Sequence, residues 1–230
     1  MNPGHIRSWL RGPVVAVATP FKEDFSLDLD ALRNNIRFMI RGGIKTGQGA
    51  LLVAAAGGEH PLLNPQERMD IMNASVEAAA GEVPVLSSIQ HTDMRVIVQL
   101  ARHASKVGIL GAQLSPTYYY LPSEGDVLRL FQHVASESDV TLMIYHTWRR
   151  SFSMSLNLLE QLAEIPSVRA VKWSARNDRP FARESRGSQN RWWLWTTMTT
   201  TYGHISLDAP RSSHTSVPSG LSISCAFGIC

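Results

Sequence analysis

Short apolar runs recur along the first three quarters of the chain, and each of the first five is followed by a segment with helical periodicity. The runs are rich in valine, leucine and isoleucine and recur about every 30 residues, the length of one strand–helix–strand unit. They begin near Val14, Ala50, Val83, Leu110, Val140 and Val168. This order of elements predicts a parallel sheet with helices packed outside it.

Capping residues mark where the helices between these runs begin. The clearest start has Asn64 as the N-cap, Pro65 in the first turn and Glu67 at the third helical position, and the apolar period that follows stops at Gly81. Comparable starts stand at Asp28, Ser123 and Ser155. In total the sequence predicts six strands and five helices.

The first strand-to-helix turn decides between two α/β architectures. A dinucleotide-binding sheet needs glycines there, where the pyrophosphate approaches the backbone, but this chain has Thr19, Pro20 and Phe21. A (β/α)₈ barrel of the TIM type requires only uniform repeats and carries its chemistry on the loops that follow the strands. We therefore predict such a barrel, incomplete because about six βα units are recognisable.

The repeating pattern stops after about Arg183, which divides the chain into two parts. Residues 1–183 form the predicted barrel body with strands one to six. The segment 184–230 is aberrant: from Arg186 onward it contains one acidic residue, Asp208, no lysine and no helical period. We hypothesise that this tail is read out of frame or is disordered, since its local signals agree with no fold.

Composition adds constraints on location and partners. A chain of 230 residues with 44% hydrophobic residues suits one large domain. The formal charge of +3 is dispersed, which gives no indication of nucleic-acid binding. The longest apolar stretch, Ala50 to Ala56, is too short to cross a bilayer, and the start of the chain lacks the apolar region of a secretory signal. Both cysteines, Cys225 and Cys230, lie in the last six residues, so no disulfide can cross-link the rest of the chain, as is usual in a reducing compartment. We therefore expect a soluble cytoplasmic protein.

Lys172 is the first candidate for chemistry because it ends the sixth apolar run, Val168 to Trp173. Burial disfavours the charged form of a lysine, and a neutral amine can attack a ketone to form an imine. The alternative is a structural lysine that extends past the strand end into water.

Tyr145 ends the fifth run in the same way. Neighbouring parallel strands share one edge, so Tyr145 and Lys172 are expected to meet at one barrel mouth, where a phenol can transfer protons. A half-buried aromatic residue at a strand end is the alternative. The loop after the fourth run has three successive tyrosines, Tyr118 to Tyr120, which suit either the site or an interface.

Taken together, these residues resemble the dihydrodipicolinate synthase and N-acetylneuraminate lyase family, the pyruvate-dependent class I aldolases. The resemblance is collinear over roughly residues 12 to 178. It is carried by Gly12-Pro13-Val14 through Thr19-Pro20-Phe21, the Gly58-Glu59 turn, Tyr118-Tyr119, Tyr145 and Val171-Lys172.

The resemblance implies a lyase that forms a Schiff base between Lys172 and pyruvate or a related 2-oxo acid. It implies that Tyr145 donates and accepts protons beside the imine, and that Tyr119 reaches across a dimer interface. Gly57 and Gly58 would bind the substrate carboxylate through backbone N–H groups, and Arg150 would receive a carboxylate with its planar fork. The family needs no cofactor beyond this imine and usually forms dimers or tetramers, so a homo-oligomer is expected.

Two departures from the family pattern concern the site. The family commonly has Gly-Thr-Thr-Gly-Glu after the second strand, whereas this chain reads Ala55-Ala56-Gly57-Gly58-Glu59, so both hydroxyls are missing. After Tyr145 the chain has His146, either a different proton carrier or a strand-end histidine bonded to backbone. The partner of the 2-oxo acid, an aldehyde if there is one, stays open.

Other classes of function lack support in the sequence. The histidines never pair at i, i+4 spacing and no Cys-x-x-Cys occurs, so no metal site is indicated. No Gly-x-Ser-x-Gly elbow supports a serine hydrolase. Two alternatives to the aldolase remain: an inactive truncated remnant of such an enzyme, and a 2-oxo sugar-acid dehydratase of the same family.

Overall fold

The computed structural model of the chain describes residues 12–116, 119, 121–147, 152–174 and 193–196. Seven strands form one sheet, in which every neighbouring pair is parallel and the spatial order follows the chain. The strands are β1 (Val14–Ala16), β2 (Ala50–Val53), β3 (Val85–Ser88), β4 (Gly111–Leu114), β5 (Leu142–Thr147), β6 (Val168–Ser174) and β7 (Trp193–Thr196).

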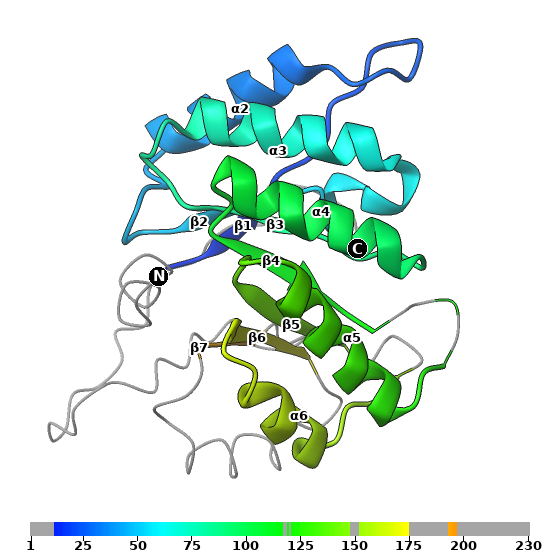
Figure 1. Cartoon of the computed structure of the whole chain (residues 1–230). Coiled ribbons are helices and arrows are strands. Elements are labelled where there is room, and N and C mark those ends of the chain that lie inside the picture. The colour runs from blue at the N-terminus through cyan, green and yellow to red at the C-terminus, as the bar shows by residue number, and fades with distance from the viewer. Residues whose placement is uncertain (1–11, 117–118, 120, 148–151, 175–192, 197–230) are drawn as a thin grey trace, which may run out of the picture.

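Five α-helices cover the outside of this sheet, each in contact with the next along the chain (Figure 1). They are α2 (Leu29–Arg41), α3 (Pro65–Ala79), α4 (Met94–Val107), α5 (Glu124–Glu137) and α6 (Leu156–Ala163). Two short 3₁₀ helices, η1 (Ala56–Gly58) and η2 (His60–Leu62), form the connection from β2 to α3. The predicted N-caps Asp28, Asn64, Ser123 and Ser155 all accept backbone hydrogen bonds in their helices.

The predicted incomplete barrel is confirmed. Among the described strands no pairing joins β7 back to β1, so the sheet is an open arc. The seventh strand was not predicted: β7 lies within the segment 184–230, where the sequence indicated neither strand nor helix. Its residues Trp193 to Thr196 are mostly aromatic or β-branched types, which favour extended backbone. This signal is only four residues long and stands in a segment of unusual composition, so the sequence alone did not predict a strand there. The rest of that segment lies outside the described residues.

Alternating side chains give the sheet two apolar faces. One face packs against the helices and contributes Val53, Ile144 and Val171 to the main core. The other face points into the barrel lumen, where a smaller core includes Leu52, Leu86, Met143 and Ala170. Because side chains in a strand alternate between faces, the residues two positions beyond Met143 in β5 and Ala170 in β6, which are Tyr145 and Lys172, are also luminal.

Candidate active site

Lys172 and Tyr145 lie side by side on the luminal face at the carboxyl end of the sheet. They are register partners in the β5–β6 pair, directly after the helix-facing pair Ile144 and Val171. The Lys172 Nζ atom is 4.5 Å from the centre of the Tyr145 ring. No described residue hydrogen-bonds the Tyr145 hydroxyl, so it is available to a ligand. The structure therefore brings together the two residues that the sequence placed at one barrel mouth.

Burial lowers the pKa of Lys172 below its ordinary value of 10.5, because the surrounding protein solvates the ammonium form poorly. The Tyr145 ring stabilises the ammonium form by a cation–π contact, but this contact is weaker than the hydration that the ammonium loses on burial. A larger fraction of this amine is therefore neutral, and so nucleophilic, than for a lysine in water.

This shift predicts how imine formation depends on pH. Only the neutral amine attacks a ketone, so the rate of imine formation should rise with pH and level off once Lys172 is fully deprotonated. Borohydride trapping of a 2-oxo acid, measured from about pH 6 to about pH 11, should give a midpoint below 10.5. A midpoint at or above that value would mean that the amine is as well hydrated as free lysine.

The turn after β2 lies at the same end of the sheet and contains Gly57 and Gly58. Gly58 is buried, its carbonyl accepts a hydrogen bond from Thr19 Oγ1 at 2.7 Å, and a Cβ atom there would lie 2.9 Å from the Val17 carbonyl oxygen. Only glycine fits this close approach of two backbones. Thr19 and Gly58 thus fix the turn against the end of β1.

The backbone donors of this turn differ from the expectation. The Gly58 N–H donates to the Ala55 carbonyl at 3.0 Å, so it is used within the turn and is not free to hold a carboxylate as predicted. The Gly57 N–H has no acceptor among the described residues, and Gly57 is exposed. Of the two predicted carboxylate donors, the geometry leaves Gly57.

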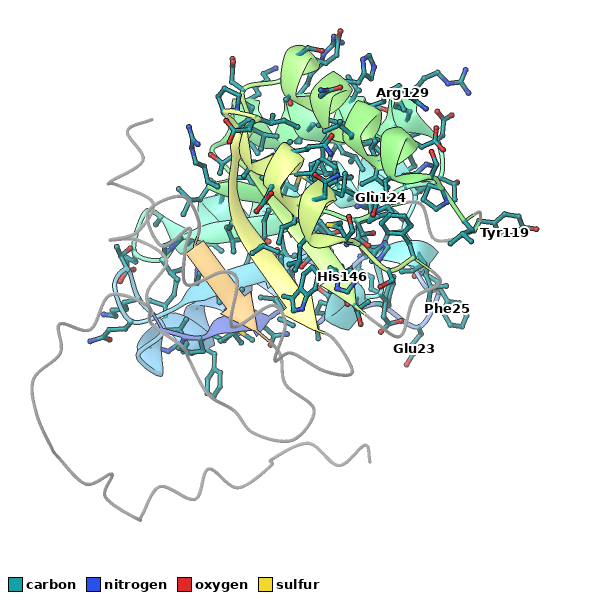
Figure 2. All side chains as sticks on the ribbon, turned by 90° about the horizontal axis from the view of Figure 1, so that it is seen from below. Glu23, Phe25, Tyr119, Glu124, Arg129 and His146 are labelled. Atoms are coloured by element: carbon teal, nitrogen blue, oxygen red, sulfur yellow. The ribbon has the colours of Figure 1, made fainter. Side chains whose placement is uncertain are left out.

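The described structure does not bring Tyr119 to the lysine. Tyr119 lies on the loop after β4 with 76% of its surface exposed, and Figure 2 shows its side chain pointing away from the sheet. Its expected reach into a second subunit stays a prediction. Arg150 lies outside the described residues.

His146 packs away from the lysine. It is the register partner of Trp173, and the two rings stack with centres 4.0 Å apart and planes 20° apart. Both are buried, and Trp173 belongs to the core between sheet and helices, the face opposite Lys172. This placement favours a structural histidine over a proton carrier at the imine.

Two buried polar residues near the site were not singled out from the sequence. Arg68 of α3 is 1% exposed and donates to the carbonyls of Ser88 at 2.6 Å and Gln90 at 2.7 Å, at the end of β3. Gln90 is 2% exposed. The signal that was available is alternation, which places residues 86, 88 and 90 on one face of the β3 segment.

Among the described residues, no helix is long and apolar enough to cross a membrane, and no three His, Cys, Asp or Glu side chains cluster as metal ligands would.

Comparison with known proteins identifies relatives of this arrangement. The family model described as the dihydrodipicolinate synthetase family matches residues 9–200. A 4-hydroxy-tetrahydrodipicolinate synthase from Chlorobium phaeovibrioides is 31% identical over 170 residues, which cover 73% of this chain and 56% of that protein. The chain thus spans about half the length of the curated relatives it matches.

Solved structures show the same fold. The dihydrodipicolinate synthase from Aquifex aeolicus superposes with a TM-score of 0.75 at 29% identity, covering 81% of this chain and 63% of that one. An N-acetylneuraminate lyase from Mycoplasma synoviae gives a TM-score of 0.73 at 21% identity, covering 81% and 63%. The same fold thus occurs in relatives named for different reactions, so fold alone does not choose the substrate.

Proposed function

This chain belongs to the dihydrodipicolinate synthetase family, and from that membership we propose that it is a lyase or aldolase that binds pyruvate or a related 2-oxo acid as an imine on Lys172. The contact between the Lys172 amine and the Tyr145 ring carries the proposal. It places a poorly solvated nucleophile beside an acid–base group in the lumen of a barrel fold whose chemistry lies at the carboxyl ends of the strands.

The proposed reaction begins with attack of the neutral Lys172 amine on the ketone carbon. Two protons are lost from the nitrogen and the ketone oxygen leaves as water, with Tyr145 as the proton carrier. The resulting imine withdraws electrons, so a C3 proton can be removed to give an enamine. The enamine adds to an aldehyde, or the reverse step cleaves the same carbon–carbon bond. Gly57 is the proposed backbone donor to the substrate carboxylate, and no separate cofactor is required.

Reductive trapping tests this function directly. The full chain is incubated with pyruvate and sodium borohydride, digested, and analysed by mass spectrometry for a reduced pyruvyl adduct. We expect one adduct per chain, on Lys172, and none when pyruvate is omitted. An unmodified Lys172, or an equal distribution of adducts over exposed lysines such as Lys106, would count against the imine mechanism.

Replacing Tyr145 with phenylalanine should separate binding from proton transfer. The ring that contacts Lys172 is kept while the hydroxyl is lost, so we expect turnover to fall about 10²- to 10⁴-fold. Pyruvate should still be trapped on Lys172, though more slowly. Steady-state kinetics and trapping by the same preparation measure both effects. Unchanged turnover would assign the proton transfer to another group.

One observation favours an alternative, the catalytically inactive remnant. Strands β1 and β7 end an open arc among the described strands, and unpaired edges disfavour a stable isolated barrel. A thermal melt followed by circular dichroism distinguishes the two proposals. A cooperative transition together with trapping supports the enzyme, whereas a featureless slope without trapping supports the remnant.

Substrate and assembly complete the proposal. A dehydratase acting on a 2-oxo sugar acid would use the same imine but release water instead of an aldehyde, so product analysis with a panel of 2-oxo acids separates the two reactions. A homo-oligomer stays proposed on the strength of family membership, and sedimentation of the intact chain tests it.

A further inference from the structure

Gln90 lies just beyond the end of β3, on the luminal face. The ladder continues past the strand, since the Ile89 N–H donates to the Gln113 carbonyl at 3.0 Å. Leu86 belongs to the luminal core and Ile89 to the helix-facing core. Alternation therefore directs Gln90, like Ser88, into the lumen.

The sheet register places Gln90 at the same height as the reactive pair. Ser88, Gln113, Met143 and Ala170 form one luminal row across β3 to β6, because each is the register partner of the next. Two residues further along lies the row that contains Gln90 just beyond β3, Tyr145 on β5 and Lys172 on β6. Neighbouring strands are about 4.8 Å apart, so Gln90 is one strand away from the β2 turn that contains Gly57.

The side chain of Gln90 has an unused donor. Its Nε2 atom is fully buried without an acceptor in the described structure. The backbone of Gln90 is hydrogen-bonded on both sides: its N–H donates weakly to Ser88 Oγ at 3.4 Å, and its carbonyl accepts from Arg68 at 2.7 Å. An unpaired buried amide group is costly in a native protein, so a ligand that accepts from Nε2 would be favoured there.

The β2 turn offers a carboxylate the backbone N–H of Gly57 but no side-chain hydroxyl from Ala56 or Gly57. Ala56 and Gly57 stand where the family pattern has threonines, and the Gly58 N–H is used by Ala55. A carboxylate at this turn has two oxygens to satisfy, so it needs a second donor from the neighbouring strand. We infer that Gln90 Nε2 supplies it and binds the carboxylate of the 2-oxo acid, a substrate-binding role that rests on the imine function proposed above.

The test compares Gln90→Met with Gln113→Met, since Gln113 is equally buried on the adjacent strand but lies one row below the reactive pair. The pyruvate concentration that gives half-maximal borohydride trapping should rise about 10- to 100-fold in Gln90→Met, because a hydrogen bond to a charged group is lost. Gln113→Met should remain near wild type. The maximal trapping rate should be similar in all three proteins.

Acetone, a ketone without a carboxylate, separates recognition from folding. Gln90→Met should lose preference for pyruvate over acetone, whereas a general loss of structure would lower trapping of both ketones equally. Gln90→Asn, which keeps a carboxamide, is the second variant if the methionine variant melts early. Equal half-saturation in the Gln90 and Gln113 variants would overturn the role of Gln90 and leave the imine function standing. No trapping in the wild-type chain would overturn both.

Discussion

Replacing Lys172 with methionine should abolish borohydride trapping of pyruvate and reduce turnover by at least about 10⁴-fold, because removing a covalent nucleophile removes the reaction path itself. Methionine has a similar length and retains contact with the Tyr145 ring. Lys172→Arg should be equally inactive, since a guanidinium stays charged and cannot form the imine. Mass spectrometry of the trapped protein and steady-state kinetics measure the two effects.

The stability of the Lys172→Met variant provides an internal control. Burial lowers the pKa of Lys172 in the folded chain. At pH values below that lowered pKa the buried amine is charged, which reduces the free energy of unfolding of the wild type. This destabilisation declines as the pH rises towards 10.5, the ordinary pKa of lysine, and is absent above it. The variant should therefore melt above the wild type at neutral pH, with a gap that narrows at alkaline pH. An inactive variant that melts lower would instead point to damage to the fold.

Lys106→Met is the matched comparison for this prediction. Lys106 is exposed near the end of α4, far along the chain from the candidate site, and the same chemical change there should affect neither trapping nor pH dependence. If trapping survives in Lys172→Met or falls equally in Lys106→Met, then the imine does not form at Lys172.

The strand-end pair was predictable from the sequence because parallel neighbouring strands end at the same edge of a sheet. Lys172 and Tyr145 both follow apolar runs, so their meeting required only the correct fold class. The face that each side chain takes was harder to derive. His146 is adjacent to Tyr145 in the sequence, but alternation and its partner Trp173 place it among the helix-facing side chains.

Contacts between distant segments explain what the sequence did not reveal. Arg68 binds carbonyls 20 and 22 residues away, and no local pattern marks an arginine for burial. The engagement of the Gly58 N–H depends on how tightly one turn winds, which composition does not determine. Strand β7 is only four residues long, too short for a clear alternating pattern. It is defined by its pairing with β6, which the sequence does not show.

Replacing Arg68 with methionine should destabilise the fold by about 2–6 kcal/mol, since each of two buried acceptors left without a donor costs about 1–3 kcal/mol. Arg68 is 1% exposed, and its two bonds of 2.6 and 2.7 Å satisfy carbonyls at the end of β3. Methionine fills similar volume but leaves these buried acceptors without their charged donor. For a chain of this size, the melting temperature should fall by on the order of 10 °C.

Arg37→Met on α2 is the control for this loss, because Arg37 is exposed and the same substitution there should change stability by less than about 0.5 kcal/mol. The loss of stability in Arg68→Lys should lie between those of Arg68→Met and Arg37→Met, because a lysine ammonium does not match the geometry of two carbonyl acceptors as a planar guanidinium does. The Gln90 carbonyl is one of the two acceptors, so Arg68→Lys should also weaken pyruvate binding. A melting temperature of Arg68→Met close to that of the wild type would mean that the end of β3 keeps its conformation without the arginine. The hydrogen bond from Arg68 would then not be what positions Gln90.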